Sequence, residues 1–301
     1  MRRPDPSYLG YRAGALAARA LPGPTTPSVA RLIGRIGVRR LPSRRLIIER
    51  NLRRALGDVP EARMADLVDQ AFGSYVQYWI ESFRLPGTSV EDLDRGTVTI
   101  GFDHIVEALD AGRGAILALP HLGAWEWAAF WLTAVKGHPV TAVAEVIEPP
   151  ELAAWFVGLR NEFGIEVVPF GPDAATACMR ALKANRVLAL PSDRDLSGTG
   201  VPVDFFGERT TLPGGPATLA IRTGAPLIPV SCYFDNDRHL GIALPPLDTA
   251  RRGKLREDVA RVTQDLADAL EVLIRRAPDQ WHLVQPNWPS DHEALAAAGL
   301  S

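Results

Sequence analysis

The sequence predicts an α/β fold, in which a twisted, mostly parallel central sheet is flanked by helices and preceded by an N-terminal helical layer. Two observations predict this fold. After residue 100, short apolar runs of strand length alternate with segments of helix length, which is typical of βα units around a parallel sheet. Before residue 87, apolar side chains recur at helical spacing between prolines. The 301 residues, 47% of them apolar, suffice to bury one large core.

The N-terminal part is expected to be helical throughout. Residues 7–57 indicate two or three helices, broken at 22–27 and at Pro42, where prolines interrupt the pattern. Residues 61–84 predict a stronger helix, because apolar side chains recur three and four positions apart until Pro86-Gly87 ends the pattern. A stripe of this kind indicates a face packed against the core.

The α/β part is expected to contain six strands, at 115–119, 140–144, 165–168, 187–190, 227–234 and 240–244. Helices are expected near 103–111, 124–136, 150–163, 173–184, 215–223 and 254–276. Ligand sites in open α/β sheets lie at the carboxyl ends of the strands. Residues 120–121, 145–150 and 191–208 follow expected strands and therefore become the candidate site segments.

Composition excludes several classes of protein. The net charge of -2 gives no global field that would attract nucleic acid. Cys178 and Cys232 are the two cysteines and have no metal-ligand spacing, so we expect no metal site, no disulfide framework and a reducing compartment. No apolar run reaches the roughly 20 residues of a membrane-spanning helix, and Arg12 and Arg19 interrupt the only stretch that resembles a secretory signal. We therefore expect a soluble or peripheral protein.

Positive charge is concentrated between residues 31 and 54, where nine arginines accompany one acid, Glu49, and alternate with leucines and isoleucines. A basic helical segment with an apolar stripe is a candidate for lying on an anionic membrane surface, where each basic residue contributes roughly 1 kcal/mol. The alternative is a solvated helix face whose apolar side packs on the domain.

His121 is the candidate general base. It follows an expected strand, and Glu126 stands five residues later, one turn into the next expected helix, from where its carboxylate could reach back to the imidazole. Such a carboxylate would fix the tautomer and stabilise the imidazolium, while the other ring nitrogen accepts a proton from a hydroxyl. Backbone N–H groups after His121 are candidates for stabilising an oxyanion. The alternative is a histidine that caps the helix and a glutamate that solvates its flank.

A covalent intermediate on the enzyme is not expected. No Gly-x-Ser-x-Gly elbow occurs, and neither cysteine has the surroundings of a nucleophile. Direct attack by an acceptor hydroxyl is therefore the preferred chemistry.

The stretch from His121 to Glu126 resembles the HX4(D/E) motif of the lysophospholipid and lipid A biosynthesis acyltransferases. Further blocks resemble other signatures of this family in matching order: 192–195, 200–208, 213–217, 224–229 and 279–282. Residues 78–86 are closer to one branch, the phosphatidylinositol mannoside acyltransferases. The resemblance covers nearly the whole chain.

The resemblance implies catalytic roles for three residues. His121 and Glu126 match the family's catalytic dyad, and Asp195 is the expected second carboxylate in contact with the histidine. Asp195 lies in a Ser/Asp/Gly loop, so capping of a turn is its structural alternative.

The resemblance also implies substrate-binding residues. Glu145 and Arg160 are expected as a polar pair that lines the acceptor side, and Asp193 and Arg194 are expected in the segment beside the catalytic histidine. For Arg160, the alternative is an arginine that complements the dipole at a helix C-terminus.

The function implied by the resemblance is transfer of a fatty acyl group, commonly palmitoyl, from acyl-CoA to a mannose hydroxyl of phosphatidylinositol mannosides. Acyl-CoA would be a co-substrate, with no cofactor and no metal, and the enzyme would be peripheral at the cytoplasmic face of the plasma membrane. A lipid A-type sugar or a lysophospholipid is the alternative acceptor, and a non-catalytic peripheral lipid-binding protein is the alternative of another class. Residues 1–301 would form one domain: a membrane-associating helical layer at 1–86, a catalytic core at 87–290 and a C-terminal tail at 291–301.

Overall fold

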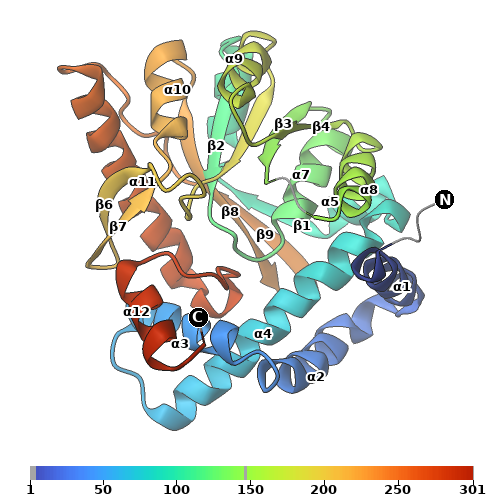
Figure 1. The fold of residues 1–301 in the computed structure, drawn as a ribbon. Coiled ribbons are helices and arrows are strands. Elements are labelled where there is room, and N and C mark those ends of the chain that lie inside the picture. The colour runs from blue at the N-terminus through green and yellow to red at the C-terminus, as the bar shows by residue number, and fades with distance from the viewer. Residues whose placement is uncertain (1–4, 146–147, 301) are drawn as a thin grey trace.

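The computed structural model describes residues 5–145 and 148–300 (Figure 1). Residues 1–4 and 301 of the expected domain, and 146–147 of one candidate site segment, lie outside the described residues. The N-terminal layer contains α1 (Pro6–Ala20), the 3-10 helix η1 (Gly23–Thr25), α2 (Thr26–Val38), α3 (Pro42–Leu56) and α4 (Glu61–Arg84). The expected helices are confirmed. Pro42 begins α3 because its fixed φ suits the first helical position.

A seven-stranded sheet forms the centre of the described molecule. The strands of the chain are β1 (Thr97–Ile100), β2 (Ala115–Leu119), β3 (Val140–Ala144), β4 (Ile165–Pro169), β5 (Val187–Pro191), β6 (Val201–Phe205), β7 (Glu208–Leu212), β8 (Leu227–Asp235) and β9 (Arg238–Ala243). The sheet order is β1-β9-β8-β2-β5-β3-β4, and only the β8–β9 pair among these neighbours is antiparallel. The mostly parallel sheet and its six expected strands are confirmed, with small shifts at their ends.

Helices cover both faces of this sheet. The helices that follow the N-terminal layer are η2 (Leu85–Gly87), α5 (Val90–Arg95), α6 (Asp103–Asp110), α7 (Trp125–Ala134), α8 (Pro150–Asn161), α9 (Ala174–Lys183), α10 (Gly215–Thr223), α11 (Leu255–Arg276), η3 (Pro278–Gln280) and α12 (Pro289–Ala297). Successive side chains of β2 point to opposite faces: Ile116 and Ala118 pack with α9, α10 and α11, whereas Ala115 and Leu117 pack with α5, α6 and α7. A strand buried on both faces therefore consists of apolar residues throughout.

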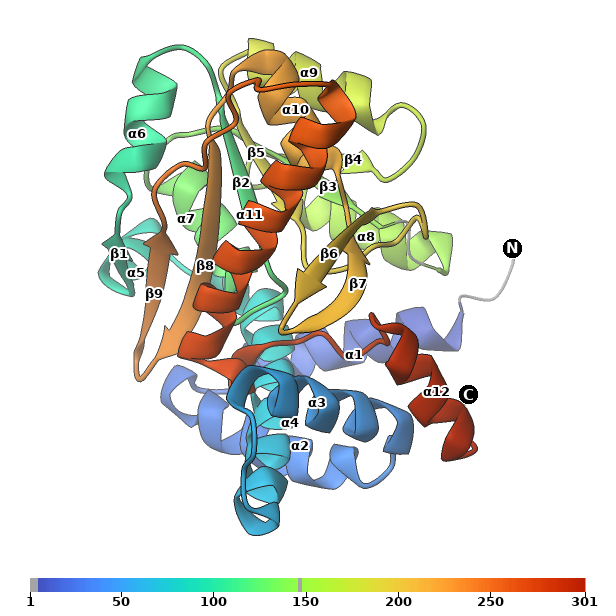
Figure 2. The same cartoon turned by 90° about the vertical axis from the view of Figure 1, so that its left-hand side faces the viewer.

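Three strands were not expected from the sequence. Strand β1 is a four-residue edge strand whose side chains are mostly exposed, so it has no apolar run. Strands β6 and β7 form a separate antiparallel hairpin with Pro202 inside it, and α11 covers this hairpin. Figure 2 shows α11 running along the sheet and past β6 and β7. Short or polar strands of this kind are stabilised by packing against neighbouring elements, which a local sequence pattern does not show.

Helix α4 connects the helical layer to the sheet. Its N-terminal half packs with α2 and α3 around Met64 and Phe72, and its C-terminal half packs with α1 and α8 around Phe83. Helices α2 and α4 approach most closely at two glycines: a Cβ on Gly34 would lie 2.6 Å from the backbone nitrogen of Gly73. Within the described residues, no helix has the length and apolar character needed to cross a bilayer.

The C-terminal residues are anchored rather than extended. Helix α12 packs on α3, where Arg50 Nε and a guanidinium nitrogen of Arg54 each lie 2.7 Å from Oδ1 of the fully buried Asp291. The expected boundary between core and tail at 290/291 therefore falls inside a packed helix.

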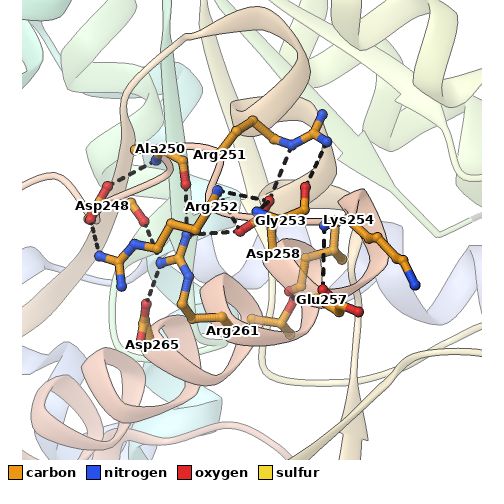
Figure 3. A network of polar contacts seen from close by, with 12 residues as sticks. Asp248, Ala250, Arg251, Arg252, Gly253, Lys254, Glu257, Asp258, Arg261 and Asp265 are labelled. Carbon is orange, nitrogen blue, oxygen red and sulfur yellow. Dashed lines mark hydrogen bonds and ion pairs between the residues drawn. The ribbon is translucent and has the colours of Figure 1, made fainter.

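The loop before α11 is held to that helix by a polar network (Figure 3). Asp258, in the first turns of α11, accepts hydrogen bonds from the backbone N–H groups of Arg252 (3.1 Å) and Gly253 (3.2 Å). Arg261 donates to the carbonyl oxygens of Asp248 and Ala250, both at 2.9 Å. The network fixes the start of α11, and further along this helix Gln264 accepts the backbone N–H of Asp204 in β6 at 2.9 Å.

Candidate active site

His121 lies in the turn between β2 and α7, at the carboxyl end of a central strand, as expected from the sequence. The turn is tight. Gly123 has φ +61°, and a Cβ at this position would lie 2.2 Å from the carbonyl oxygen of Cys232. That carbonyl accepts the N–H of Ala124 at 2.7 Å, so the backbone of β8 fixes the beginning of α7. Only glycine suits this position, because of both the conformation and the space.

The carboxylate that contacts His121 is Asp193. His121 Nδ1 lies 2.7 Å from Oδ1 of Asp193, and the backbone N–H of His121 donates to Oδ2 at 3.0 Å. Strands β2 and β5 are parallel neighbours with Leu119 opposite Pro191, so the residues just after the two strands meet at one edge of the sheet. Asp193 is fully buried, whereas 36% of the His121 side chain is exposed.

The surroundings of His121 and Asp193 shift the pKa of each side chain. Burial disfavours the charged imidazole, but the negative charge of Asp193 and the hydrogen bond to it outweigh burial, so the pKa of His121 is raised. Burial would raise the pKa of Asp193, but the charge and hydrogen bonds of His121, with a hydrogen bond from Trp281, lower it. Asp193 therefore remains a carboxylate that accepts the Nδ1 proton, and Nε2 is the ring nitrogen left to act as a base.

Glu126 does not contact His121, contrary to expectation. Its buried carboxylate pairs instead with Arg160 of α8, which donates from Nε to Oε1 at 3.1 Å and makes a second, shorter contact through a terminal nitrogen. Among the described residues, no hydrogen bond joins His121 and Glu126. A buried carboxylate requires a donor-rich partner, and the guanidinium supplies two N–H groups where the imidazole could supply one.

Asp195 does not contact the histidine either, and this expectation is wrong. Its carboxylate accepts from the backbone N–H groups of Ser197 (2.9 Å) and Gly200 (2.7 Å) and from the hydroxyl of Thr211 (2.9 Å). Asp195 thus holds the loop after β5 and ties it to β7, as the turn-capping alternative predicts. The sequence placed an acidic segment beside His121, as observed, but it selected Asp195 as the contact. The structure has Asp193 in this position, because Asp193 lies closer to the end of β5.

Glu145 and Arg160 do not form the expected pair. Glu145, just after β3, accepts from a terminal nitrogen of Arg194 at 3.0 Å, and Arg160 binds Glu126. The Arg194 side chain is 17% exposed and that of Glu145 is 56% exposed, and both charges act on the pKa of His121. The Arg194–Glu145 pair therefore stands near His121, and the buried Arg160–Glu126 pair is a separate one.

Backbone N–H groups after His121 are already used. Leu122 donates to the carbonyl of Pro120 (2.8 Å), Gly123 to that of Gln280 (2.9 Å) and Ala124 to that of Cys232 (2.7 Å). The expectation that these groups stabilise an oxyanion is therefore not supported by their hydrogen bonds.

The C-terminal segment 280–287 contacts the turn that carries His121, and these contacts were not expected from the sequence. Trp281 Nε1 donates to Oδ2 of Asp193 at 2.9 Å, and the backbone N–H of His282 donates to the carbonyl of His121 at 2.7 Å. His282 Nε2 lies 2.9 Å from Ser74 Oγ, and burial, with repulsion from His121, lowers the pKa of His282 to about 3. His282 is therefore neutral. The sequence marked 279–282 only through the resemblance, because contacts over such separations have no local pattern.

Two small adjoining cavities lie beside Glu126. They share the lining residues Tyr78, Ser82, Leu85 and Glu126, and one of them extends between Phe130, Phe156, Leu159 and Arg160. The cavities are thus mostly apolar, with the buried ion pair at one wall. Within the described residues, no group of three or more histidine, cysteine or acidic side chains has an arrangement suited to a metal ion.

Comparison with known proteins identifies the family. The pattern of the bacterial lipid A biosynthesis acyltransferases matches residues 6–290. Phosphatidylinositol mannoside acyltransferase of Mycolicibacterium smegmatis (strain ATCC 700084 / mc(2)155) is 42% identical over 287 residues, which cover 94% of this chain and 91% of that protein. Two proteins of the same name from Mycobacterium tuberculosis, strains CDC 1551 / Oshkosh and H37Rv, are 41% and 40% identical over 291 residues, covering 93% of this chain and 88% of each relative. With a basic histidine at the carboxyl end of a central strand and a match over nearly its whole length, the chain belongs to the bacterial lipid A biosynthesis acyltransferase family.

Proposed function

We propose that this enzyme transfers a fatty acyl group, commonly palmitoyl, from acyl-CoA to a mannose hydroxyl of a phosphatidylinositol mannoside. The observation that carries the chemistry is the 2.7 Å contact between His121 Nδ1 and the buried Asp193, which leaves Nε2 available as a base. The acceptor is inferred from the names of the relatives that are 40–42% identical.

The reaction proceeds by direct attack. Nε2 of His121 removes the proton of the acceptor hydroxyl as its oxygen attacks the thioester carbonyl, and Asp193 stabilises the resulting imidazolium. The tetrahedral intermediate then breaks the carbon–sulfur bond, and the imidazolium returns the proton to the departing thiolate. The products are the ester and free CoA, and no covalent acyl-enzyme forms.

The cavities beside Glu126 are proposed to receive the first part of the acyl chain. Leu85, Phe130, Phe156 and Leu159 supply an apolar wall of the kind that binds a hydrocarbon. The more exposed Arg194–Glu145 pair is proposed to lie on the polar substrate side, where the guanidinium suits the phosphates of the donor or acceptor.

An exposed basic face on α1, α2 and the beginning of α3 is proposed to bind the anionic cytoplasmic leaflet. We define the basic face by its exposed apolar and basic side chains: Leu9, Leu16, Leu32, Ile33, Ile36, Leu41, Arg31, Arg35, Arg39, Arg40, Arg44 and Arg45. The remaining arginines of the basic segment, Arg50, Arg53 and Arg54, pair with acids of α3, α4, β7 and α12. Within the basic face, Arg35 lies 3.6 Å from Asp69, and its side chain is still 67% exposed. Exposed leucines rimmed by arginines suit a surface with acyl chains and negative headgroups.

An acceptor panel tests the proposed function. Purified protein and labelled palmitoyl-CoA would be incubated with phosphatidylinositol mannosides, a lipid A-type disaccharide and a lysophospholipid, and labelled lipid would be measured. We expect label on the mannoside, and loss of it in a folded His121→Ala variant. Preferential labelling of another acceptor would reassign the substrate. Tight lipid binding without transfer or thioester hydrolysis would instead favour the lipid-binding protein.

A further inference from the structure

We propose that Trp281 is a positioning residue: its indole N–H holds the Asp193 carboxylate in the rotation that presents Oδ1 to His121 Nδ1. The importance of this contact for acyl transfer rests on the proposed function. The effect of the Trp281–Asp193 hydrogen bond on the His121–Asp193 pair is a separate claim, which can be tested without measuring acyl transfer.

The hydrogen bonds to Asp193 show why the indole matters. Oδ1 accepts the imidazole at 2.7 Å, and Oδ2 accepts two donors, the backbone N–H of His121 at 3.0 Å and Trp281 Nε1 at 2.9 Å. Asp193 is fully buried, so no bulk water can replace a lost donor. Without the indole, Oδ2 would keep one backbone donor, and the carboxylate could turn about its terminal torsion, which is soft.

The indole is itself fixed from two sides. Its ring centroid lies 5.5 Å from that of Phe206 and 6.3 Å from that of Trp288, within the aromatic cluster that the β6–β7 hairpin forms with the C-terminal segment. Its backbone pairs with Leu122 in an antiparallel bridge, one residue after His121. Trp281 therefore contacts Leu122, the residue after His121, through its backbone and Asp193 through its side chain.

Rotation of Asp193 would change the charge state of His121. The groups whose charges act on this imidazole are Asp193, Arg194 and Glu145, with the neutral His282 behind it. Arg194 and burial both favour the neutral ring, so the aligned carboxylate is the main group that favours the imidazolium. If the alignment were lost, the imidazolium of the transition state would lose its principal stabilising contact.

The test compares two buried tryptophans of one cluster. Trp281→Phe removes the N–H that binds Asp193, and the matched control Trp288→Phe removes an N–H that donates to the carbonyl of Phe205 at 3.3 Å. Both side chains are almost completely buried. Benzothienylalanine at position 281 keeps the bicyclic shape and lacks the N–H, so it decides the question if Trp281→Phe does not fold.

Histidine NMR titration of the full-length chain gives a measure independent of turnover. In Trp281→Phe and in the benzothienyl variant, we expect the pKa of His121 to fall and its downfield Nδ1 proton resonance to weaken, with neither change in Trp288→Phe. With the acceptor, kcat should fall about ten- to a hundredfold, the effect of losing one hydrogen bond to a charged group, while KM for the donor changes little.

Two outcomes would overturn the assignment: an unchanged His121 titration in both position-281 variants, or equal shifts in Trp281→Phe and Trp288→Phe, which would indicate a packing effect. A shifted titration in a protein that acylates no acceptor would leave the contact established and refute the proposed function.

Discussion

Replacing Asp193 by asparagine should reverse the tautomer of His121. The carboxylate receives two N–H donors at Oδ2, from the backbone of His121 and from Trp281, and one at Oδ1. In Asp193→Asn, the single amide oxygen will occupy the Oδ2 position, because an NH₂ group there would face two donors. The amide NH₂ will then point at Nδ1 and donate to it. The imidazole proton must consequently move to Nε2, the nitrogen that should act as the base.

The size of the effect follows from what the variant removes. A positioned general base contributes about 10²–10⁴-fold to rate, and the corresponding tautomer reversal in serine proteases costs about 10⁴-fold in kcat. Because Asp193 is fully buried, solvent does not screen the loss of its charge. We therefore expect kcat to fall about 10³-fold or more, with little change in KM for the acyl donor.

The assay measures thiol release from palmitoyl-CoA with saturating acceptor, as a function of pH. Because the pKa of His121 is raised, the acidic limb of wild-type kcat/KM should have its midpoint above about 6.5, the usual histidine value. In Asp193→Asn the limb should move to lower pH. The matched control is Asp195→Asn, which alters the same segment without contacting His121 and should leave the midpoint in place.

The same pair also links stability to pH. The folded pKa of His121 is above its unfolded value, so the stabilisation is fully present below about pH 6.5 and is lost as pH rises through the folded pKa. The folded pKa of Asp193 is lowered, so its contribution is present above about pH 3.9 and is lost as pH falls through the folded value.

Wild-type turnover in Asp193→Asn, together with an inactive, folded Glu126→Gln, would refute the assignment of Asp193 as the carboxylate that assists His121.

Three further outcomes are expected. Glu126→Ala leaves the buried Arg160 unpaired and should cost about 3–5 kcal/mol in urea unfolding. Glu145→Ala removes a carboxylate that is itself 56% exposed and should cost about 0–1 kcal/mol. Equal costs would contradict the difference in burial between the two carboxylates. Gly34→Ala should lower the free energy of unfolding by about 1–3 kcal/mol, because the new methyl group meets the backbone of α4. An unchanged free energy of unfolding would show that α2 can move away from α4 without cost. Arg40→Glu should weaken binding to anionic liposomes, measured by flotation, about thirtyfold. The side chain changes by two charges, and each charge contributes roughly 1 kcal/mol. If neither this variant nor added salt changes the binding, the basic face is not the membrane-binding surface.

The main elements of the fold could be predicted from the sequence because their signals are local. Strands β2 and β5 are largely buried and therefore consist of apolar residues, and the buried side chains of α4 recur at helical spacing. Helix α11 is predictable for the same reason. The short β1 and the β6–β7 hairpin were missed, because their stability comes from the surfaces that they meet rather than from their own residues.

The sequence by itself also selected His121 as the candidate base, because it follows a strand and ligand sites in open α/β sheets lie at the carboxyl ends of strands. It determined that an acidic segment after β5 would lie alongside, because parallel neighbours end at one edge. Only the tertiary structure decided which carboxylate binds the imidazole. Glu126 is held by Arg160 of α8, and Asp193 is held by Trp281, 88 residues further along the chain. A buried charge is placed where enough donors converge, and donors from distant segments converge only when the chain has folded.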